Sequence, residues 1–287
     1  MTTLLTALIV SALAVLIATA AVGMGMALLA YARGAEAATS PASDTRLPVP
    51  EPLTRAGILL ALALTAAAVV GRAILVGHAP WSNLHEFSLA FAATTLLTYV
   101  LLARSHPIGG LAPFVALLGA GLIGFALSLD ARADPLVPAL QQPVLLTVHV
   151  GTAMAAYAIA GVAFVAAAAE IGQRAAQDRI GLLPSAATLR AVGHRAVLIA
   201  FPVLTVAIAL GSVWANLAWR SYWSNDPKEL AAAATWLVFG AYLHVAGRRD
   251  RWEAMAPWLI VIGFAGVLFT YVGAGLFFVG EHSYGTP

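Results

Sequence analysis

Two histidines, His149 and His282, lie on either side of an aromatic and charged segment, residues 214–229, in a chain that is otherwise strongly apolar. The segment holds three of the seven tryptophans and the only lysine, Lys228. Neutral imidazole is a common axial ligand for haem iron. Indole rings could cover the faces of a porphyrin, and Arg220 or Lys228 could meet its propionates. The pattern therefore favours a flat, amphipathic ligand that carries charge at one edge.

Each of these residues also has a simpler explanation when it is considered alone. His149 begins an apolar run, where a polar ring can bond to interfacial water, although ionisable groups within membrane spans tend to be functional. His282 is an ordinary tail histidine unless it acts together with His149. Trp214, Trp219 and Trp223 are also expected as residues of an interfacial aromatic belt.

The end of the aromatic segment has the pattern of a helix start. Asp226 fits the N-cap, Pro227 the first helical position and Glu229 the N3 position of a capping box. Asp226 is therefore either a structural cap or a ligand contact. Trp219 and Trp223 are four residues apart, so a helical turn would place both on one face.

The composition predicts a polytopic helical membrane protein with an all-α fold. Of 287 residues, 61% are hydrophobic and 10% are charged, whereas soluble domains carry about 25% charged residues. Several apolar runs reach the roughly 20 residues that cross a bilayer core, and they are too continuous for a membrane barrel. Without cysteine, no disulfide framework or thiolate metal site can form. About eight spans are expected, at residues 4–31, 56–77, 87–104, 109–127, 144–170, 196–217, 229–246 and 257–279.

The distribution of arginine and lysine predicts that both termini are extracytoplasmic. One set of loops carries 11 positive residues and the opposite set carries 3. The positive set comprises residues 32–55, 105–108, 171–195 and 247–252, with Arg104 at a span end. The extracytoplasmic set comprises residues 78–86, 128–143, 218–228 and 280–287.

The whole chain, residues 1–287, is expected to form a single membrane domain. The first apolar run is longer than that of a signal peptide and lacks a positive start, so we expect a retained span. Segment 34–54, rich in proline, alanine and serine, is expected to be a flexible cytoplasmic linker.

His244 lies too far along the seventh span to share an iron with His149 or His282 unless the helix breaks. It follows Glu229 by about 15 helical residues, a rise of roughly 22 Å. His244 is therefore either a second ligand station nearer the cytoplasm or an interfacial residue beside arginines. The pattern assigns no ligand role to the remaining histidines, His78, His85, His106 and His194.

Residues 214–229 resemble the tryptophan-rich WWD signature of haem-handling membrane proteins, most closely the CcsA (also ResC) subfamily of cytochrome c biogenesis. The chain departs from that signature at Arg220, where the family usually has glycine, and at Asn225, where it usually has tryptophan. The resemblance extends over most of the chain, through residues 80–83 before Glu86, the His149 segment with Tyr157, residues 235–238 and 242–244, and residues 280–284.

The resemblance implies a subunit of a cytochrome c synthase complex that presents haem b at the outer face. The haem is then attached to the Cys-X-X-Cys-His segment of apocytochrome c. The implied partners are a CcsB/ResB-type membrane subunit, apocytochrome c and a thiol-reducing thioredoxin-like protein, with no nucleic acid. The implied location is a bacterial plasma membrane, or alternatively a thylakoid membrane.

By position, His149 and His282 match the family's external axial ligands, and His244 matches its membrane-embedded histidine, whose second iron ligand comes from the partner subunit. No catalytic nucleophile or base is visible, so the expected contribution is positioning, which can supply much of the rate of a bond-forming step. The residues expected to bind haem are His149, His282, His244, Trp214, Trp219, Trp223, Arg220 and Asp226.

Three alternatives remain open at this level. A CcmC-like protein would hand haem to a carrier, but such proteins tend to have fewer spans. A solute transporter would be expected to show inverted repeats and broken helices, and no repeat is evident. A purely structural scaffold would be colourless when purified.

Overall fold

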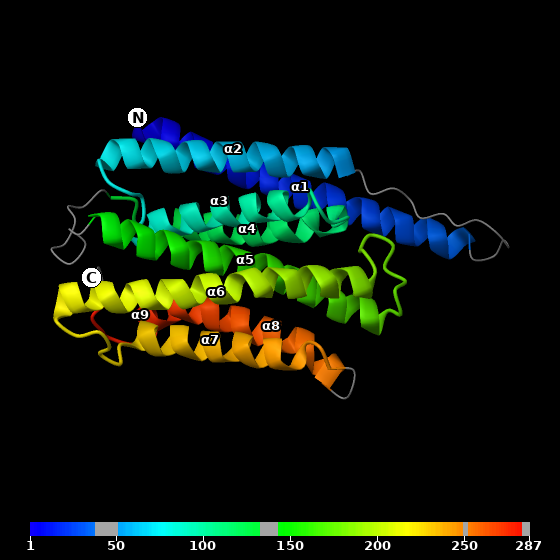
Figure 1. Cartoon of the computed structure of the whole chain (residues 1–287). Coiled ribbons are helices and arrows are strands. Elements are labelled where there is room, and N and C mark those ends of the chain that lie inside the picture. Colours follow the sequence, from blue (N-terminus) through cyan, green and yellow to red (C-terminus); the bar gives the residue numbers. More distant parts are fainter. Residues whose placement is uncertain (38–50, 133–142, 249–251, 283–287) are drawn as a thin grey trace.

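In the computed structural model, which describes residues 1–37, 51–132, 143–248 and 252–282, the chain is a bundle of long helices (Figure 1). No strand occurs within these residues, which confirms the all-α prediction. The elements are α1 (Thr2–Ala37), α2 (Glu51–Val76), α3 (Leu84–Leu102), η1 (Gly109–Leu111), α4 (Ala112–Ser128), α5 (Pro143–Ala175), α6 (Ala186–Trp219), α7 (Pro227–Val245), α8 (Trp252–Leu268), η3 (Phe269–Gly273) and α9 (Ala274–Phe277).

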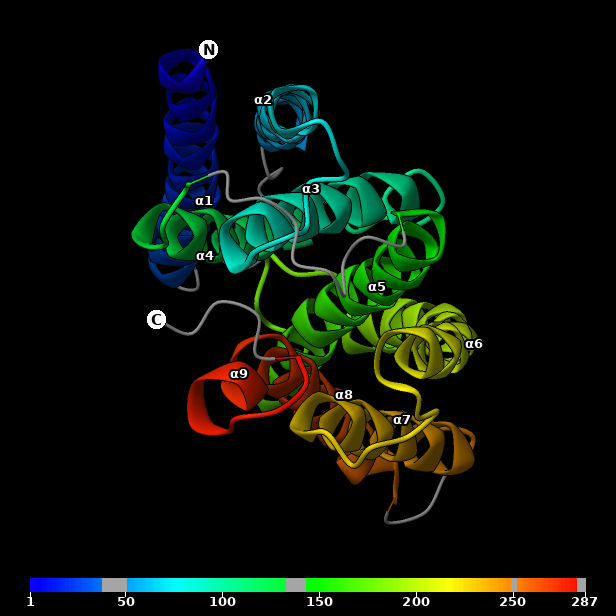
Figure 2. The same cartoon turned by 90° about the vertical axis from the view of Figure 1, so that its left-hand side faces the viewer.

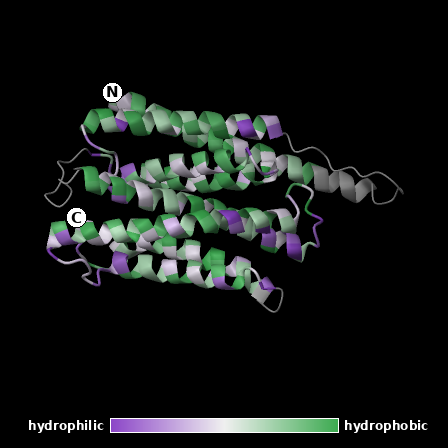
Figure 3. Cartoon of the chain, in the orientation of Figure 1, coloured by the Kyte–Doolittle hydropathy of each residue, from purple (hydrophilic) through white to green (hydrophobic). Residues whose placement is uncertain are grey.

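Seven helical segments among the described residues are long and apolar enough to cross a membrane. They correspond to seven of the eight predicted spans. The remaining predicted span, residues 229–246, corresponds to α7. This helix has 19 residues, a length of about 28 Å, but its charged first turn and alanine-rich body make it less apolar than the others. It packs against both α6 and α8. Figure 3 shows apolar residues along the helices and hydrophilic residues gathered at the two ends of the bundle, as expected for a protein that spans a membrane.

The helices alternate in direction, so the start of α1 and helix α9 lie at the same end of the bundle (Figure 1). The starts of α3, α5 and α7 and the end of α6 share this end, which we call the terminal end. Figure 2 views it along the helices, with α5 between a group formed by α1 to α4 and a group formed by α6 to α9. Contacts of α5 with α3, α6 and α8 join the two groups.

Two helices of the terminal end begin at side-chain caps, which fix where the loops before them stop. Asn83 Oδ1 accepts a bond of 2.9 Å from the backbone N–H of Glu86 at the start of α3. Asp226 caps α7 in a full capping box with Glu229, as the sequence predicts. Such caps satisfy backbone N–H groups that have no partner within the helix.

Several predicted boundaries differ from the observed ones. Helices α1 and α2 include both ends of the predicted linker, residues 34–37 and 51–54, and residues 38–50 lie outside the described part of the chain. Helix α6 begins at Ala186, so His194 lies on a helix rather than in a loop, with its Nδ1 3.2 Å from the hydroxyl of Tyr242. The predicted span covered only the apolar run, residues 196–217. Helix α6 begins ten residues earlier, in a polar stretch whose side chains can pair with neighbouring helices.

An ionic cluster at the opposite end of the bundle joins α5, α6 and α8. Glu170 of α5 is buried, with its Oε1 3.1 Å from Arg190 Nε and 2.6 Å from Arg174 Nη2. Arg190 Nη1 also lies 2.6 Å from Glu253 of α8. These shared charges hold the three helices together, and two of them, α5 and α6, line the cavity described below.

A buried ion pair between α2 and α3 fixes the loop that enters α3. Arg72 Nε lies 2.8 Å from Glu86 Oε1, and Glu86 is only 1% exposed. The second oxygen of Glu86 accepts bonds from the backbone N–H and the hydroxyl of Ser82, at 3.0 and 2.7 Å. Since Ser82 follows Trp81, this carboxylate also determines where the Trp81 indole lies.

Replacing Arg72 by methionine should destabilise the protein by about 3–5 kcal/mol, because it leaves the buried Glu86 carboxylate without its counter-charge. The double variant Arg72→Met/Glu86→Gln should recover a large part of this loss, since glutamine keeps an acceptor for Ser82 and carries no charge. Thermal unfolding in detergent measures both. Equal losses in the single and the double variant would contradict this account of the pair.

Candidate functional site

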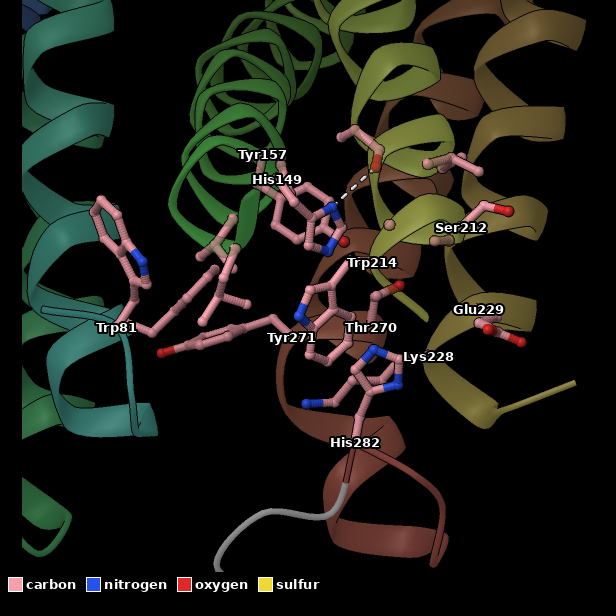
Figure 4. A pocket seen from close by; sticks show the side chains of 18 of the residues that line it. Trp81, His149, Tyr157, Ser212, Trp214, Lys228, Glu229, Thr270, Tyr271 and His282 are labelled. Carbon is pink, nitrogen blue, oxygen red and sulfur yellow. Dashed lines mark hydrogen bonds between the residues drawn. The ribbon is translucent and has the colours of Figure 1, made fainter. Parts of the chain in front are cut away.

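A cavity of about 250 Å³ opens at the terminal end of the bundle and is lined by residues from α3, α5, α6, α7 and η3 (Figure 4). Aromatic and aliphatic side chains make up most of its wall. Four of the predicted site residues lie on this wall, namely His149, Trp214, Trp223 and His282. Residues far apart in the sequence thus meet around one apolar space, the usual setting of a small-molecule site.

The imidazole of His149 is oriented by the backbone of α6. Its Nδ1 lies 3.0 Å from the carbonyl oxygen of Ala207, the bond drawn dashed in Figure 4. A carbonyl can only accept, so Nδ1 carries the proton, and in the neutral ring the lone pair is on Nε2. Gly211, one turn further along α6, leaves space for the ring, because a Cβ there would lie 2.6 Å from His149 Cε1.

The imidazole of His282 is held in the same way by Asp226. His282 Nδ1 lies 2.8 Å from Asp226 Oδ1, and the His282 backbone N–H donates to Oδ2 at 3.3 Å. Asp226 Oδ1 also accepts from the backbone N–H of Lys228 at 2.8 Å, as the cap of α7. Asp226 is thus a helix cap, one of the two functions that the sequence left open, and it also supports His282; it is absent from the described wall of this cavity.

The pKa of the Asp226 carboxyl reflects opposing effects. Burial raises it, but the hydrogen bond and charge of His282 and the backbone N–H donors lower it to about 2. The carboxylate is therefore ionised throughout the neutral range and remains an acceptor for His282. Gly280 lets the chain pass directly over this carboxylate, since a Cβ at that position would overlap Asp226 Oδ2.

The indole of Trp214 lies between the two imidazoles (Figure 4). Its ring centroid is 6.2 Å from that of His149, with the planes 9° from parallel, and 5.8 Å from that of His282. Trp214 is 2% exposed. The two axial ligands of one iron face each other across a single ring plane, so these histidines can ligate one haem together only after Trp214 moves. This obstruction arises from packing and has no counterpart in the sequence pattern.

The predicted shared face of Trp219 and Trp223 is wrong, because α6 ends at Trp219. Trp219 instead packs edge-on against both Trp214 and His282, each at 4.8 Å between ring centroids. Trp223 lies in the following loop, 41% exposed, where its Nε1 donates a 2.9 Å bond to Asn225 Oδ1.

Both departures from the WWD signature occur at residues with a left-handed backbone. Arg220 ends α6 with φ at +61°, and Asn225 has φ at +59°. Glycine adopts this left-handed conformation without cost and asparagine tolerates it better than most residues. Arg220 is exposed and is absent from the described wall of the cavity. Its backbone shapes the helix end, whereas the cation on the wall is Lys228.

The other histidines lie away from the cavity. His244 occupies the last turn of the unbroken helix α7, exposed and at the opposite end from His149 and His282, so it does not share their site. His78 and His85 bond to the carbonyl oxygens of Ala79 and Ala126, at 2.9 and 2.8 Å. In each of these two rings, Nδ1 is therefore engaged in a local structural hydrogen bond.

Sequence reasoning missed several residues of the wall, among them Thr270 and Tyr271. Both belong to η3, a π-helical turn between α8 and α9, and such turns are frequent at functional sites. Tyr271 stacks on Phe87 of α3 at 5.3 Å between ring centroids and hydrogen-bonds Ser88. The wider turn has no clear sequence signal, whereas Trp81 could have been found from its place in the segment of residues 80–83.

Residues 81–282 match a family model described as "Cytochrome C assembly protein". The chain belongs to this family. It is 36% identical over 241 residues to the cytochrome c biogenesis protein CcsA of Parasynechococcus marenigrum, covering 73% of this chain and 78% of that protein. It is 35% identical over 283 residues to the CcsA of Synechococcus elongatus, covering 80% and 86%. These matches identify it as a CcsA-type member, a membrane protein of cytochrome c biogenesis.

The fold of this chain also occurs in a solved structure. A solved structure of the cytochrome c haem lyase CcmF superposes with a TM-score of 0.69 at 22% identity, over 93% of this chain. This chain covers 46% of the CcmF chain, so it spans about half the length of that protein. At this identity the likeness concerns the fold alone.

Replacing Arg220 by glycine should stabilise the protein by up to about 1 kcal/mol, because glycine relieves the left-handed strain at the end of α6. The matched variant Arg220→Ala removes the same side chain but keeps a Cβ, so it should give no gain. Thermal unfolding in detergent distinguishes them. A gain in the alanine variant equal to that in the glycine variant would show that the side chain, rather than the backbone, carries the effect.

Proposed function

We propose that this chain binds haem in the cavity at its terminal end, holds the iron with His149 and His282, and presents the haem to apocytochrome c. The carrying observation is that both imidazoles line one apolar cavity, each with Nδ1 bonded to an oxygen acceptor. An acceptor bonded to one ring nitrogen fixes the tautomer and orientation of a histidine whose other nitrogen binds a metal. Membership of the cytochrome c assembly family supports haem as the ligand.

Haem binding in this site requires the indole of Trp214 to leave the space between the histidines. The present cavity, about 250 Å³, lies just below the range of roughly 300–1,000 Å³ common for small-molecule pockets. Displacing the indole enlarges the space between the two imidazoles. Trp214 and Trp219 then provide aromatic surface beside the ring, and Trp223 covers the entrance from the loop.

The proposed ligand is haem b, whose two vinyl groups react with the thiols of the Cys-X-X-Cys-His segment of apocytochrome c. This chain contains no cysteine, so the thiols come from the apoprotein, kept reduced by a thioredoxin-like protein. The residues of the cavity bind the ring and leave its vinyl edge open, so that proximity contributes much of the rate. The histidine of the incoming segment replaces His149 or His282 on the iron.

The terminal end of the bundle is proposed to face the extracytoplasmic side. The loops that the sequence assigns to one side carry 11 of the arginines and lysines, against 3 in the loops assigned to the side of His282, and positive loops remain in the cytoplasm. The proposed membrane is the plasma membrane of a bacterium. The thylakoid membrane is the alternative, supported by the cyanobacterial relatives and by a relative from Chlamydomonas reinhardtii that is 36% identical over 224 residues.

His244 is proposed to mark an earlier haem station near the cytoplasmic side. Its side chain is exposed on α7, where a neighbouring membrane subunit of the CcsB/ResB type could place the second axial ligand. Haem would then move from this surface to the cavity at the terminal end, where His149 and His282 receive it.

Replacement of either His149 or His282 by glycine should convert the spectrum of the haem-loaded protein from a six-coordinate to a five-coordinate form and weaken binding. Added imidazole should restore the six-coordinate spectrum, because it fills the space of the missing ring. The matched control His78→Gly should leave the spectrum unchanged. An unaltered haem spectrum in both ligand variants would refute the axial ligation.

Replacing Gly211 by alanine should weaken haem binding by about 10- to 100-fold, the usual effect of disturbing the support of a metal ligand. The new methyl group would displace the His149 ring from its contact with Ala207. A Cβ added to Gly151 of α5 would meet no atom within 4 Å, so Gly151→Ala is the control and should bind haem normally. Haem titration followed by absorbance measures both. Equal affinities in the two variants would contradict the proposed position of His149.

A further inference from the structure

Lys228, the only lysine of the chain, extends from the first turn of α7 into the cavity (Figure 4). Its side chain is half-buried and runs beside α9, where its Cε lies 4.0 Å from a Cβ placed on Gly275. The ammonium group points away from Glu229 in Figure 4. The cavity wall is mostly apolar but also includes Glu229, and a partly buried cation requires a negatively charged partner to offset its lost hydration.

The nearest carboxylates in the sequence are already engaged elsewhere. Asp226 holds His282 and caps α7. Glu229 Oε2 accepts from the backbone N–H of Ser224, at 2.8 Å, and of Asp226, at 3.1 Å. Among the described residues, Lys228 Nζ makes no hydrogen bond or ion pair, and the charge of Asp226 acts on it only without direct contact.

Two further donors on the same wall also have no acceptor. The indole nitrogens of Trp81 and Trp214 are buried without a hydrogen-bond partner among the described residues. An indole N–H can only donate, and a buried donor without an acceptor costs about 1–3 kcal/mol. The residues that carry these three donor groups, Lys228, Trp81 and Trp214, all belong to the wall of one cavity.

We infer that Lys228 binds a carboxylate of the ligand, with the indole N–H group of Trp81 as a supporting donor. This inference rests on the proposed function, in which the carboxylate is a haem propionate. Carboxylate oxygens accept strong, charge-assisted bonds from an ammonium group. Arg220, the other cation that the sequence offered for this role, ends α6 at the surface and is absent from the described cavity wall.

Binding of the propionates at Lys228 also orients the haem. Asp226, which holds His282, and Lys228 belong to the same cap of α7, so one turn of helix locates both the iron ligand and the carboxylate. The vinyl groups lie on the edge of the haem ring opposite the propionates. Lys228 therefore determines which edge of the ring is presented for thioether formation, and it acts as a binding residue rather than a catalytic one.

The test compares haem with haem dimethyl ester, in which both propionates are esterified and uncharged. Each is titrated into the purified full-length protein in detergent, as wild type, Lys228→Met and Lys228→Arg. We expect Lys228→Met to weaken haem binding by about tenfold or more, as the loss of a charge-assisted hydrogen bond predicts, and to leave binding of the ester unchanged. Lys228→Arg should restore most of the affinity for haem.

Arg220→Met is the matched control, since it removes a cation from the same loop region and should change neither affinity. Equal weakening of haem and ester by Lys228→Met would overturn the inference, because it would show a structural effect. Unchanged haem affinity in Lys228→Met would overturn it as well. If the wild type binds neither ligand, the proposed function itself fails, an outcome distinct from the loss of discrimination at Lys228.

Discussion

The carboxylate of Asp226 is the interaction on which the site depends most. It caps α7, receives both the ring and the backbone N–H of His282, and lies directly beneath Gly280. A residue from the end of the chain is thereby fixed against a helix that begins more than fifty residues earlier. Because the same cap places Lys228 on the cavity wall, the proposed iron ligand and the proposed propionate anchor are both positioned by one ionised group.

The cavity is arranged for a ligand and is partly closed without one. Trp214 fills the space between His149 and His282, and its own N–H has no acceptor in the described structure. The closed arrangement thus leaves donors on the wall unsatisfied. A ligand that displaces the indole and supplies acceptors recovers part of the free energy lost by leaving these donors without a hydrogen bond. The rigid supports, namely the Arg72–Glu86 pair and the cluster around Glu170, lie outside the cavity.

Much of the fold and part of the site were predictable from sequence, because both depend on local chemistry. Apolar run lengths predicted the helices, and the order of Asp226, Pro227 and Glu229 predicted the cap. The flanking positions of His149 and His282 also predicted that the two residues lie near the aromatic segment, and both line the cavity. Four features depend on three-dimensional packing or on backbone conformation and were missed: Trp214 between the imidazoles, the end of α6 at Trp219, the left-handed Arg220, and the π-helical turn that carries Tyr271.

The most direct test of the central claim is an experimental structure of the haem-loaded protein. The account predicts one iron in the cavity at the terminal end, bonded to Nε2 of His149 on one face and to Nε2 of His282 on the other. In that structure the Trp214 indole no longer lies between the two rings. Haem bound elsewhere while Trp214 still separates His149 from His282 would contradict the account.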